Sequence, residues 1–196
     1  MTAGSTDLAD REDMAHLSAG HDAALSALMD RHGERLFHYL VRQLNNESDA
    51  ADVAQETFVR VYHHRTRFDP AQKFSTWLYT IATNLVRDRF RWHKRHPQVS
   101  LDAERGEAGA ILDALPDAAA SASEQIATEE RAVEVRAAIE SLPHDLRTPL
   151  ILSEYEGLSH AEIGAVLNCS AKAVETRLYR ARNHLRKRLA GILQQG

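Results

Sequence analysis

The stretch 158–189 constrains the fold of this chain more than any other part of the sequence. Ser159 is followed three residues later by Glu162, which is the spacing of a capping box at the start of a helix. The short helix that this predicts ends at "NCS", where Asn168 suits turn geometry and Ser170 can cap a second helix. A capped short helix, a tight turn and a longer helix together predict a helix-turn-helix unit.

The second helix of this unit, 171–189, separates apolar from polar side chains. Its apolar positions form one continuous stripe of Val174, Leu178, Ala181, Leu185 and Leu189. Its other face presents Lys172, Glu175, Thr176, Tyr179, Arg180 and Asn183, and Arg177 and Arg182 flank this face. Basic helix ends are common because they complement the helix dipole, so the basic C-terminal end alone does not indicate DNA binding. The polar N-terminal half within a helix-turn-helix unit does, because such a helix enters the major groove.

The remainder of the sequence also favours helices. Hydrophobic residues make up 43% and aromatic residues 6% of the 196 residues, and β-branched runs are scarce. Apolar residues recur at three- and four-residue steps over 12–44, with Gly20 and Gly33 as expected interruptions, and again over 49–64 and 74–96. We therefore predict an all-α protein.

A change in composition divides the chain. The stretch 97–128 is rich in Ala, Ser, Gly, Asp and Glu and too weakly hydrophobic to hold a core, so we predict a flexible acidic linker there. Two small helical domains, 1–96 and 129–196, would flank it. The net charge is only -4, but basic residues gather at 87–95 and 172–188, as expected of a nucleic-acid-binding chain.

Other classes of function find little support. The single cysteine, Cys169, the absence of a charged-then-apolar leader and the shortness of the apolar runs predict a cytoplasmic protein that does not insert into a membrane. Among 11 histidines, only His63 with His64 and His93 with His96 approach the spacing of metal ligands. We predict neither a metal nor a cofactor, and no enzymatic activity, because phosphate loops, dinucleotide turns and nucleophile elbows are missing.

Three stretches resemble one known family. The sequence "LPHDLRTPLILSEYEGLSHAEIGAVLNCSAKAVETRLYRARNHLRKRL" is similar to region four of the extracytoplasmic-function (ECF) bacterial sigma factors. The sequences "DAADVAQETFVRVY" and "FSTWLYTIATNLVRDRFR" resemble region two of the same family. The order of the regions, the linker and the length agree as well. The resemblance implies a subunit that joins core RNA polymerase, directs it to a promoter, helps to melt the DNA and is held in check by an anti-sigma factor.

The resemblance also implies roles for residues in region two. Those expected to dock on the clamp helices of the polymerase are Asp52, Gln55, Glu56, Phe58 and Val59. Those expected to contact bases of the separated minus-10 strand are Phe68, Phe74, Ser75, Thr76, Trp77 and Asn84, with Arg87, Arg89 and Arg91 on its phosphates. Phe74 and Trp77 also have helical spacing with apolar neighbours, so a place in the core is an equal alternative for each.

In region four the resemblance assigns the minus-35 element to the second helix of the helix-turn-helix unit. The expected contacts are Ser170, Lys172, Glu175, Thr176, Tyr179 and Arg180, with Arg147 and Arg177 on phosphates. Glu175 departs from the family, in which many members have a cation there; a carboxylate can instead accept a hydrogen bond from cytosine. Two alternatives remain open from the sequence: a stand-alone helix-turn-helix repressor or activator, and a helical enzyme or scaffold whose basic helix binds an acidic partner.

Overall fold

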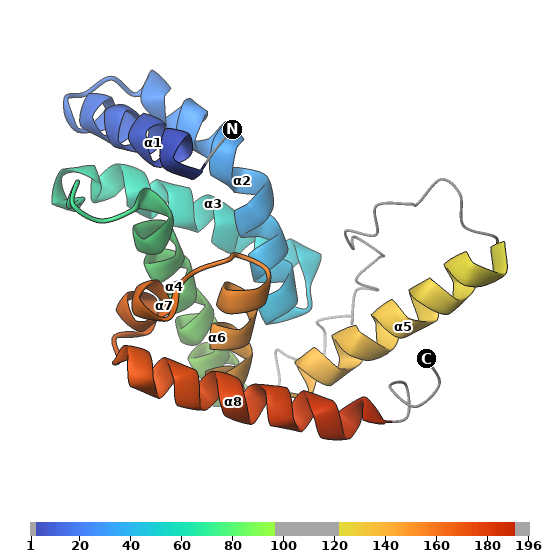
Figure 1. Ribbon diagram of the computed structural model, residues 1–196. Coiled ribbons are helices and arrows are strands. Elements are labelled where there is room, and N and C mark those ends of the chain that lie inside the picture. Colours follow the sequence, from blue (N-terminus) through green and yellow to red (C-terminus); the bar gives the residue numbers. More distant parts are fainter. Residues whose placement is uncertain (1–2, 97–121, 191–196) are drawn as a thin grey trace.

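The computed structural model describes residues 3–96 and 122–190, and within them every regular element is a helix. Figure 1 shows an N-terminal group of helices in blue and green beside a C-terminal group in orange and red. The predicted all-α class is confirmed. Most of the predicted linker, 97–121, lies outside the described residues, and the next helix begins at Ala122, within the stretch assigned to the linker.

Four α-helices and one 3-10 turn make up the N-terminal group. They are α1 (Ala3–Ser18), α2 (Ala23–Leu44), α3 (Glu47–His63), the turn η1 (Arg65–Arg67) and α4 (Phe74–Arg95). Gly20, with a φ of 95°, follows the end of α1. Asn45, with a φ of 51°, ends α2, and the Asn46 side chain caps α3 by accepting a hydrogen bond from the Asp49 N–H at 2.8 Å. The prediction that Gly33 interrupts a helix was wrong, because one interior glycine costs a well-packed helix only about 1 kcal/mol.

The centre of the N-terminal group is apolar with one buried polar pair. Tyr39 on α2 and Thr83 on α4 are fully buried, and their hydroxyl oxygens lie 2.8 Å apart. Burial raises the pKa of Tyr39 well above its usual value, so its hydroxyl stays protonated. The ring of Tyr39 also meets that of Tyr79 edge-on, with centroids 5.0 Å apart. These contacts fix α4 against α2.

The C-terminal group contains the predicted helix-turn-helix unit. Its helices are α5 (Ala122–Glu140), α6 (His144–Glu154), α7 (His160–Leu167) and α8 (Ala171–Arg188). The capping box is confirmed: Ser159 accepts a hydrogen bond from the Glu162 N–H, and the Glu162 carboxylate accepts one from the Ser159 N–H. Asn168 adopts the left-handed conformation at φ 52°, and Ser170 caps α8, as the sequence predicted.

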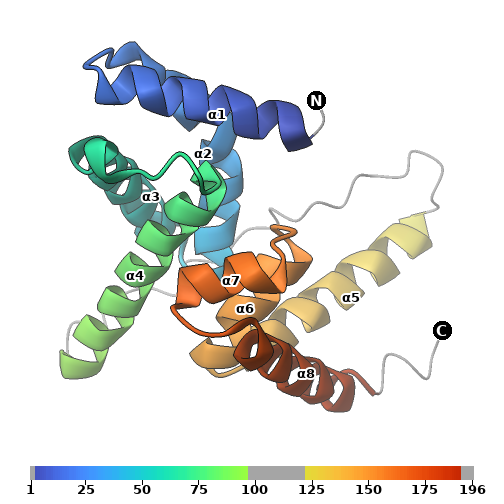
Figure 2. The ribbon, with the colours of Figure 1, turned by 60° about the vertical axis from the view of Figure 1, so that its left-hand side comes forward.

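The two groups are in direct contact. Helix α7 packs across α4, as Figure 2 shows, and helix α6 packs against α2. The guanidinium of Arg42 lies over the ring of Tyr155 at 4.2 Å from its centroid, and the rings of Phe90 and His144 meet with centroids 5.0 Å apart. Buried apolar side chains of both groups join in one core.

Candidate nucleic-acid interface

The N-terminal half of α8 presents a polar face to solvent. The side chains exposed there include Lys172, Glu175, Thr176, Tyr179 and Arg180, and Tyr179 is 67% exposed. The opposite face is buried in the core through Val174, Leu178 and Ala181, which fixes the rotation of the helix about its axis. An exposed tyrosine beside hydroxyl and cationic donors is suited to base edges and phosphates.

Two contacts within this face affect what it can bind. The Lys172 ammonium lies 2.8 Å from the Glu175 carboxylate, and this hydrogen-bonded ion pair lowers the pKa of Glu175. The Thr176 hydroxyl donates to the Lys172 carbonyl at 3.0 Å. Glu175 is therefore ionised at neutral pH, and Lys172 must leave or share this carboxylate in order to contact a phosphate. Arg177 is half-buried beside the turn, where its guanidinium lies 3.6 Å from the Cys169 sulfur.

The turn between α7 and α8 depends on Gly164, which the sequence reasoning missed. The Gly164 carbonyl accepts a hydrogen bond from the Cys169 N–H at 2.9 Å. A Cβ at position 164 would lie 2.7 Å from the Cys169 carbonyl oxygen, closer than real Cβ atoms come to backbone oxygen. The available signal was a lone glycine in a short helix immediately before a tight turn.

Arg147, expected to contact a phosphate, does not lie on the exposed face of α8. Its guanidinium donates to the carbonyls of Glu140 and Leu142 and, across the boundary between the two groups, to that of Gln43 at 3.2 Å. Burial lowers the pKa of Arg147. In this arrangement Arg147 holds α5, α6 and α2 together.

At the start of α4 the structure gathers the expected aromatic residues into one cluster. The ring centroid of Phe68 lies 5.3 Å from that of Trp77 and 6.1 Å from that of Phe74. Phe74 and Thr76 are buried, whereas Phe68, Ser75 and Trp77 are half-buried. Phe74 therefore occupies the core, and Phe68, Ser75 and Trp77 retain an exposed edge.

The polar residues expected on the minus-10 strand lie further along α4. Asn84 is exposed, and its side-chain oxygen accepts a hydrogen bond from Arg87 at 3.1 Å. Arg89 forms an ion pair with Asp49 on α3, and Arg91 forms one with Asp88 on the preceding turn of α4. Asn84 and Arg87 thus share one face, while Arg89 and Arg91 are tied to carboxylates.

An apolar groove of about 680 Å³ runs between α2 and α3. Its α3 wall includes Gln55, Phe58 and Val59, which the sequence had assigned to polymerase docking, and Val59 is 41% exposed. The α2 wall, with Leu25 and Met29, was missed, because these residues fit the apolar stripe of a core helix equally well. Asp52 and Glu56 are exposed on the same helix, and Glu56 pairs with Arg60 at 2.8 Å.

In residues 3–96 and 122–190 no three His, Cys, Asp or Glu side chains lie together so that they could hold a metal ion. In the same ranges no helix combines the length and the apolar character that a membrane span requires.

Two protein-family models match the chain, one in each group of helices. Residues 28–96 match the model "Sigma-70 region 2", and residues 132–185 match "Sigma-70, region 4". The first match contains most of α2 and all of α3 and α4, and the second contains α6, α7 and most of α8. Helix α1 precedes the first match.

Comparison with known proteins gives relatives over most of the chain. The ECF RNA polymerase sigma factor SigW of Bacillus subtilis is 36% identical, with 88% of this chain and 92% of that protein covered. Among solved structures, CnrH in complex with the cytosolic domain of CnrY is similar, with a TM-score of 0.68, 29% identity and coverage of 93% and 98%. The sigma factor RpoE in complex with the anti-sigma factor NepR from Bartonella quintana shares the fold, with a TM-score of 0.64, 21% identity and coverage of 84% and 96%.

Proposed function

Because the chain belongs to the ECF RNA polymerase sigma factors of the sigma-70 family, we propose that it binds core RNA polymerase through the α2–α3 groove and promoter DNA through α4 and α8. It is an alternative sigma factor that directs transcription initiation, and the stand-alone repressor or activator is set aside. Sigma factors are generally non-catalytic regulators. The single observation that carries the residue-level proposal is that one chain presents an exposed helix-turn-helix face and, elsewhere, an open apolar groove.

The groove between α2 and α3 is suited to a helical partner with basic flanks. Its floor is apolar, and the carboxylates of Asp52 and Glu56 are exposed on the same helix α3. We assign the clamp helices of core RNA polymerase to this groove. Val59→Asp places a charge at the partly exposed edge of the groove and should weaken polymerase binding at least about tenfold, because that charge would lose its water on docking.

The matched control for this variant is Val133→Asp. Val133 is 59% exposed on α5, away from the groove, so the same substitution there should leave polymerase affinity unchanged. Affinity is measured by titrating purified core polymerase into the labelled chain. Equal weakening by both variants, or by neither, would contradict the assignment of the groove.

On the minus-35 element, Thr176, Tyr179 and Arg180 are assigned to base edges in the major groove. Ser170, Lys172 and Arg177 flank them and are assigned to phosphates, while the ionised Glu175 is suited to accept a hydrogen bond from the amino group of cytosine. Arg147 reaches a phosphate in this proposal only if it leaves its present carbonyl partners.

On the minus-10 element, Asn84 is assigned to a separated base and Arg87 to the neighbouring phosphate, because both lie on one accessible face of α4. Phe68, Ser75 and Trp77, which lie nearer the start of α4, are assigned to bases of the same strand. Phe74 and Thr76 support these residues from the core. Arg89 and Arg91 reach the strand by exchanging their carboxylate partners for phosphates.

The test is transcription in vitro from a pooled promoter library with core polymerase, in the presence and absence of the chain. Start sites that appear only with the chain would carry both promoter elements. Arg180→Ala should weaken use of the minus-35 element and leave polymerase binding intact, whereas Arg186→Ala, on the last turn of the same helix, should affect neither. The proposal would be refuted if no new start site appeared with the chain and the free chain bound tightly to duplex sites.

We further propose that an anti-sigma factor regulates this chain in the cytoplasm, where polymerase resides, and that no cofactor or metal is required. The similarity to CnrH, which was solved with the cytosolic domain of CnrY, supports a proteinaceous regulator. The division into residues 1–96, 97–128 and 129–196 is part of the same proposal. Addition of EDTA should leave the initial binding of the chain to core polymerase unchanged.

A further inference from the structure

His32 on α2 connects helix α1 to the aromatic cluster at the start of α4. Its Nε2 atom lies 2.9 Å from each carboxylate oxygen of Asp10 on α1. A carboxylate accepts hydrogen bonds and does not donate them, so Nε2 carries a proton and donates to Asp10. The His32 ring also meets the ring of Phe74, with centroids 5.0 Å apart and a tilt of 55° between the planes. One side chain therefore joins a carboxylate of α1 to the Phe74 ring.

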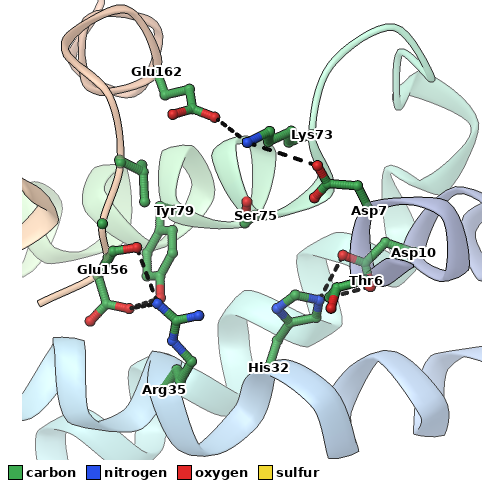
Figure 3. Close-up of a pocket in the computed structure, with 12 residues that line it drawn as sticks. Thr6, Asp7, Asp10, His32, Arg35, Lys73, Ser75, Tyr79, Glu156 and Glu162 are labelled. Carbon is green, nitrogen blue, oxygen red and sulfur yellow. Dashed lines mark hydrogen bonds and ion pairs between the residues drawn. The ribbon is translucent and has the colours of Figure 1, made fainter. Parts of the chain in front are cut away.

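Asp10 holds the His32 ring in one orientation. The Asp10 side chain is only 1% exposed and also forms an ion pair with Arg31. Arg31 in turn lies 2.8 Å from the Asp13 carboxylate, so its guanidinium is held by two acids of α1. A buried carboxylate without partners is strongly disfavoured, so Asp10 keeps its contacts with Arg31 and His32. Figure 3 shows His32 and Asp10 facing each other at one side of a cavity.

Phe74 passes this restraint on to the two aromatic side chains that keep an exposed edge. Its ring is 1% exposed, and its centroid lies 6.1 Å from that of Phe68 and 6.2 Å from that of Trp77. The rings of Phe68 and Trp77 also contact each other, with centroids 5.3 Å apart. Because side chains in a core are closely packed, a shift of the Phe74 ring displaces both neighbours. The orientation of His32 therefore affects where the exposed edges lie.

Helix α1 also contacts both ends of the segment that carries Phe68. The Ser18 hydroxyl donates a hydrogen bond to the Arg65 carbonyl at 2.9 Å, at the start of η1. The Asp7 carboxylate lies 3.8 Å from the ammonium of Lys73, the residue before α4. Helix α1 precedes the match to region 2, yet it holds the segment that this match contributes to the aromatic cluster.

The link from α1 to the aromatic cluster lies within the N-terminal group. His32 and Asp10 line a cavity of about 200 Å³ together with Ser75 and with charged side chains of both groups. Those charged side chains have partners of their own: Arg35 pairs with Glu156 at 3.4 Å, and Lys73 pairs with Glu162 at 3.0 Å. The carboxylate that holds His32 is therefore that of α1, and no residue of the C-terminal group is needed for it.

We propose that Asp10 and His32 are positioning residues, which fix Phe74 and thereby the exposed edges of Phe68 and Trp77. The side chains of Asp10 and His32 are 1% and 11% exposed, so they act through Phe74 and not by contact with DNA. The consequence for the separated minus-10 strand rests on the proposed function, in which those edges contact bases. A base stacks only on a ring that lies in the right place, so a displaced ring should weaken strand binding.

The first measurement follows the fluorine resonances of 5-fluorotryptophan in the free, full-length chain. The sequence has two tryptophans, Trp77 in the aromatic cluster and Trp92 near the other end of α4, so Trp92 is an internal reference. Trp92→Phe assigns the two resonances. His32→Gln keeps a nitrogen donor for Asp10 but removes the ring that contacts Phe74. It should shift the Trp77 resonance and leave that of Trp92 in place.

Asp10→Asn tests whether the carboxylate acts through His32. Loss of the charge weakens the hold on the His32 ring, so the Trp77 resonance should shift here as well. The double variant should shift it no further than His32→Gln alone, because both changes disturb the same contact. Asp13→Asn is the matched control, since Asp13 lies on the same helix and pairs with the same Arg31. It should leave the Trp77 resonance unchanged.

The second measurement uses the chain bound to core polymerase. The probe is a single-stranded oligonucleotide with the minus-10 element of a promoter that the wild type selects from the pooled library. His32→Gln should weaken binding of this strand about two- to tenfold, as for the disturbance of one aromatic pair. The affinity for core polymerase should stay that of the wild type. Trp77→Ala, which removes one of the exposed edges, should weaken strand binding at least as much.

Three results of the first measurement would overturn the positioning role: an unchanged Trp77 resonance in His32→Gln, equal shifts of both tryptophans, or an equal shift in Asp13→Asn. DNA and polymerase are absent there, so this outcome is independent of the proposed function. Unchanged strand affinity in His32→Gln would also overturn the role if Trp77→Ala lowers that affinity. If Trp77→Ala leaves it unchanged too, the assignment of these rings to the minus-10 strand is refuted, while a shifted resonance still shows that Asp10 and His32 position the cluster.

Discussion

Substitution of Gly164 by alanine tests whether the turn between α7 and α8 is as tightly built as its geometry indicates. The added Cβ would lie 2.7 Å from the Cys169 carbonyl oxygen and 3.5 Å from the Ala171 nitrogen. Ordinary contact begins near 3.4 Å, so the backbone of the turn must move by several tenths of an ångström. That movement also stretches the hydrogen bond from the Cys169 N–H to the Gly164 carbonyl.

The expected loss of stability combines three effects. Overpacking against backbone costs about 1–3 kcal/mol. Weakening of the hydrogen bond adds up to about 1 kcal/mol. The higher helix propensity of alanine offsets about 1 kcal/mol of this loss of stability. The unfolding free energy should therefore fall by up to about 3 kcal/mol. Helix α8 should also shift relative to α7, and use of the minus-35 element should decrease.

Urea unfolding followed by circular dichroism measures this change, and Gly33→Ala is the matched control. Gly33 also lies inside a helix, but a Cβ there meets nothing within 4 Å. The same substitution should therefore stabilise the chain by up to about 1 kcal/mol through propensity alone. If both variants change stability in the same direction, the steric argument for Gly164 is refuted.

Two other side chains, Tyr39 and His144, give predictions of defined sign. Tyr39→Phe should lower the unfolding free energy by about 1–3 kcal/mol in urea titrations, because the Thr83 hydroxyl loses its partner in the core; an unchanged midpoint would contradict this. Burial, aided by Arg147 and Arg87, lowers the pKa of His144 below its usual 6.5, so the folded chain binds fewer protons there than the unfolded chain. This contribution to stability is complete above pH 6.5 and is lost as the pH falls through the folded pKa. His144→Gln should flatten the dependence of the unfolding free energy on pH between about 5 and 7, and an unchanged slope would contradict the assignment.

The sequence predicted features that depend on neighbouring residues. Ser159 and Ser170 cap their helices through residues three positions further along the chain, and Asn168 ends α7 with its own left-handed backbone. The residue types and their spacing are therefore enough to predict these features. The helical class followed in the same way, from periodicity along each segment. Gly33 was misjudged because the surrounding packing, rather than local propensity, decides whether a helix continues.

Contacts between distant segments could not be predicted. Tyr79 meets Glu156 across 77 positions, and Arg35 meets it across 121. Which of many exposed carboxylates becomes buried depends on how the two groups dock, and no local pattern records that. For the same reason the sequence assigned Glu162 only to its cap, and it gave no sign that the guanidinium of Arg147 donates to three backbone carbonyls. The two walls of the apolar groove likewise come from different helices.

The two proposed DNA surfaces differ in how the chain holds them. The face of α8 is oriented by α6 and α7 of its own group and by the cap at Ser170, so it is formed whether or not the two groups touch. The start of α4 has its surroundings completed by the other group, through Lys73 and Tyr79. Separation of the groups therefore leaves α8 unchanged and alters the surroundings of α4.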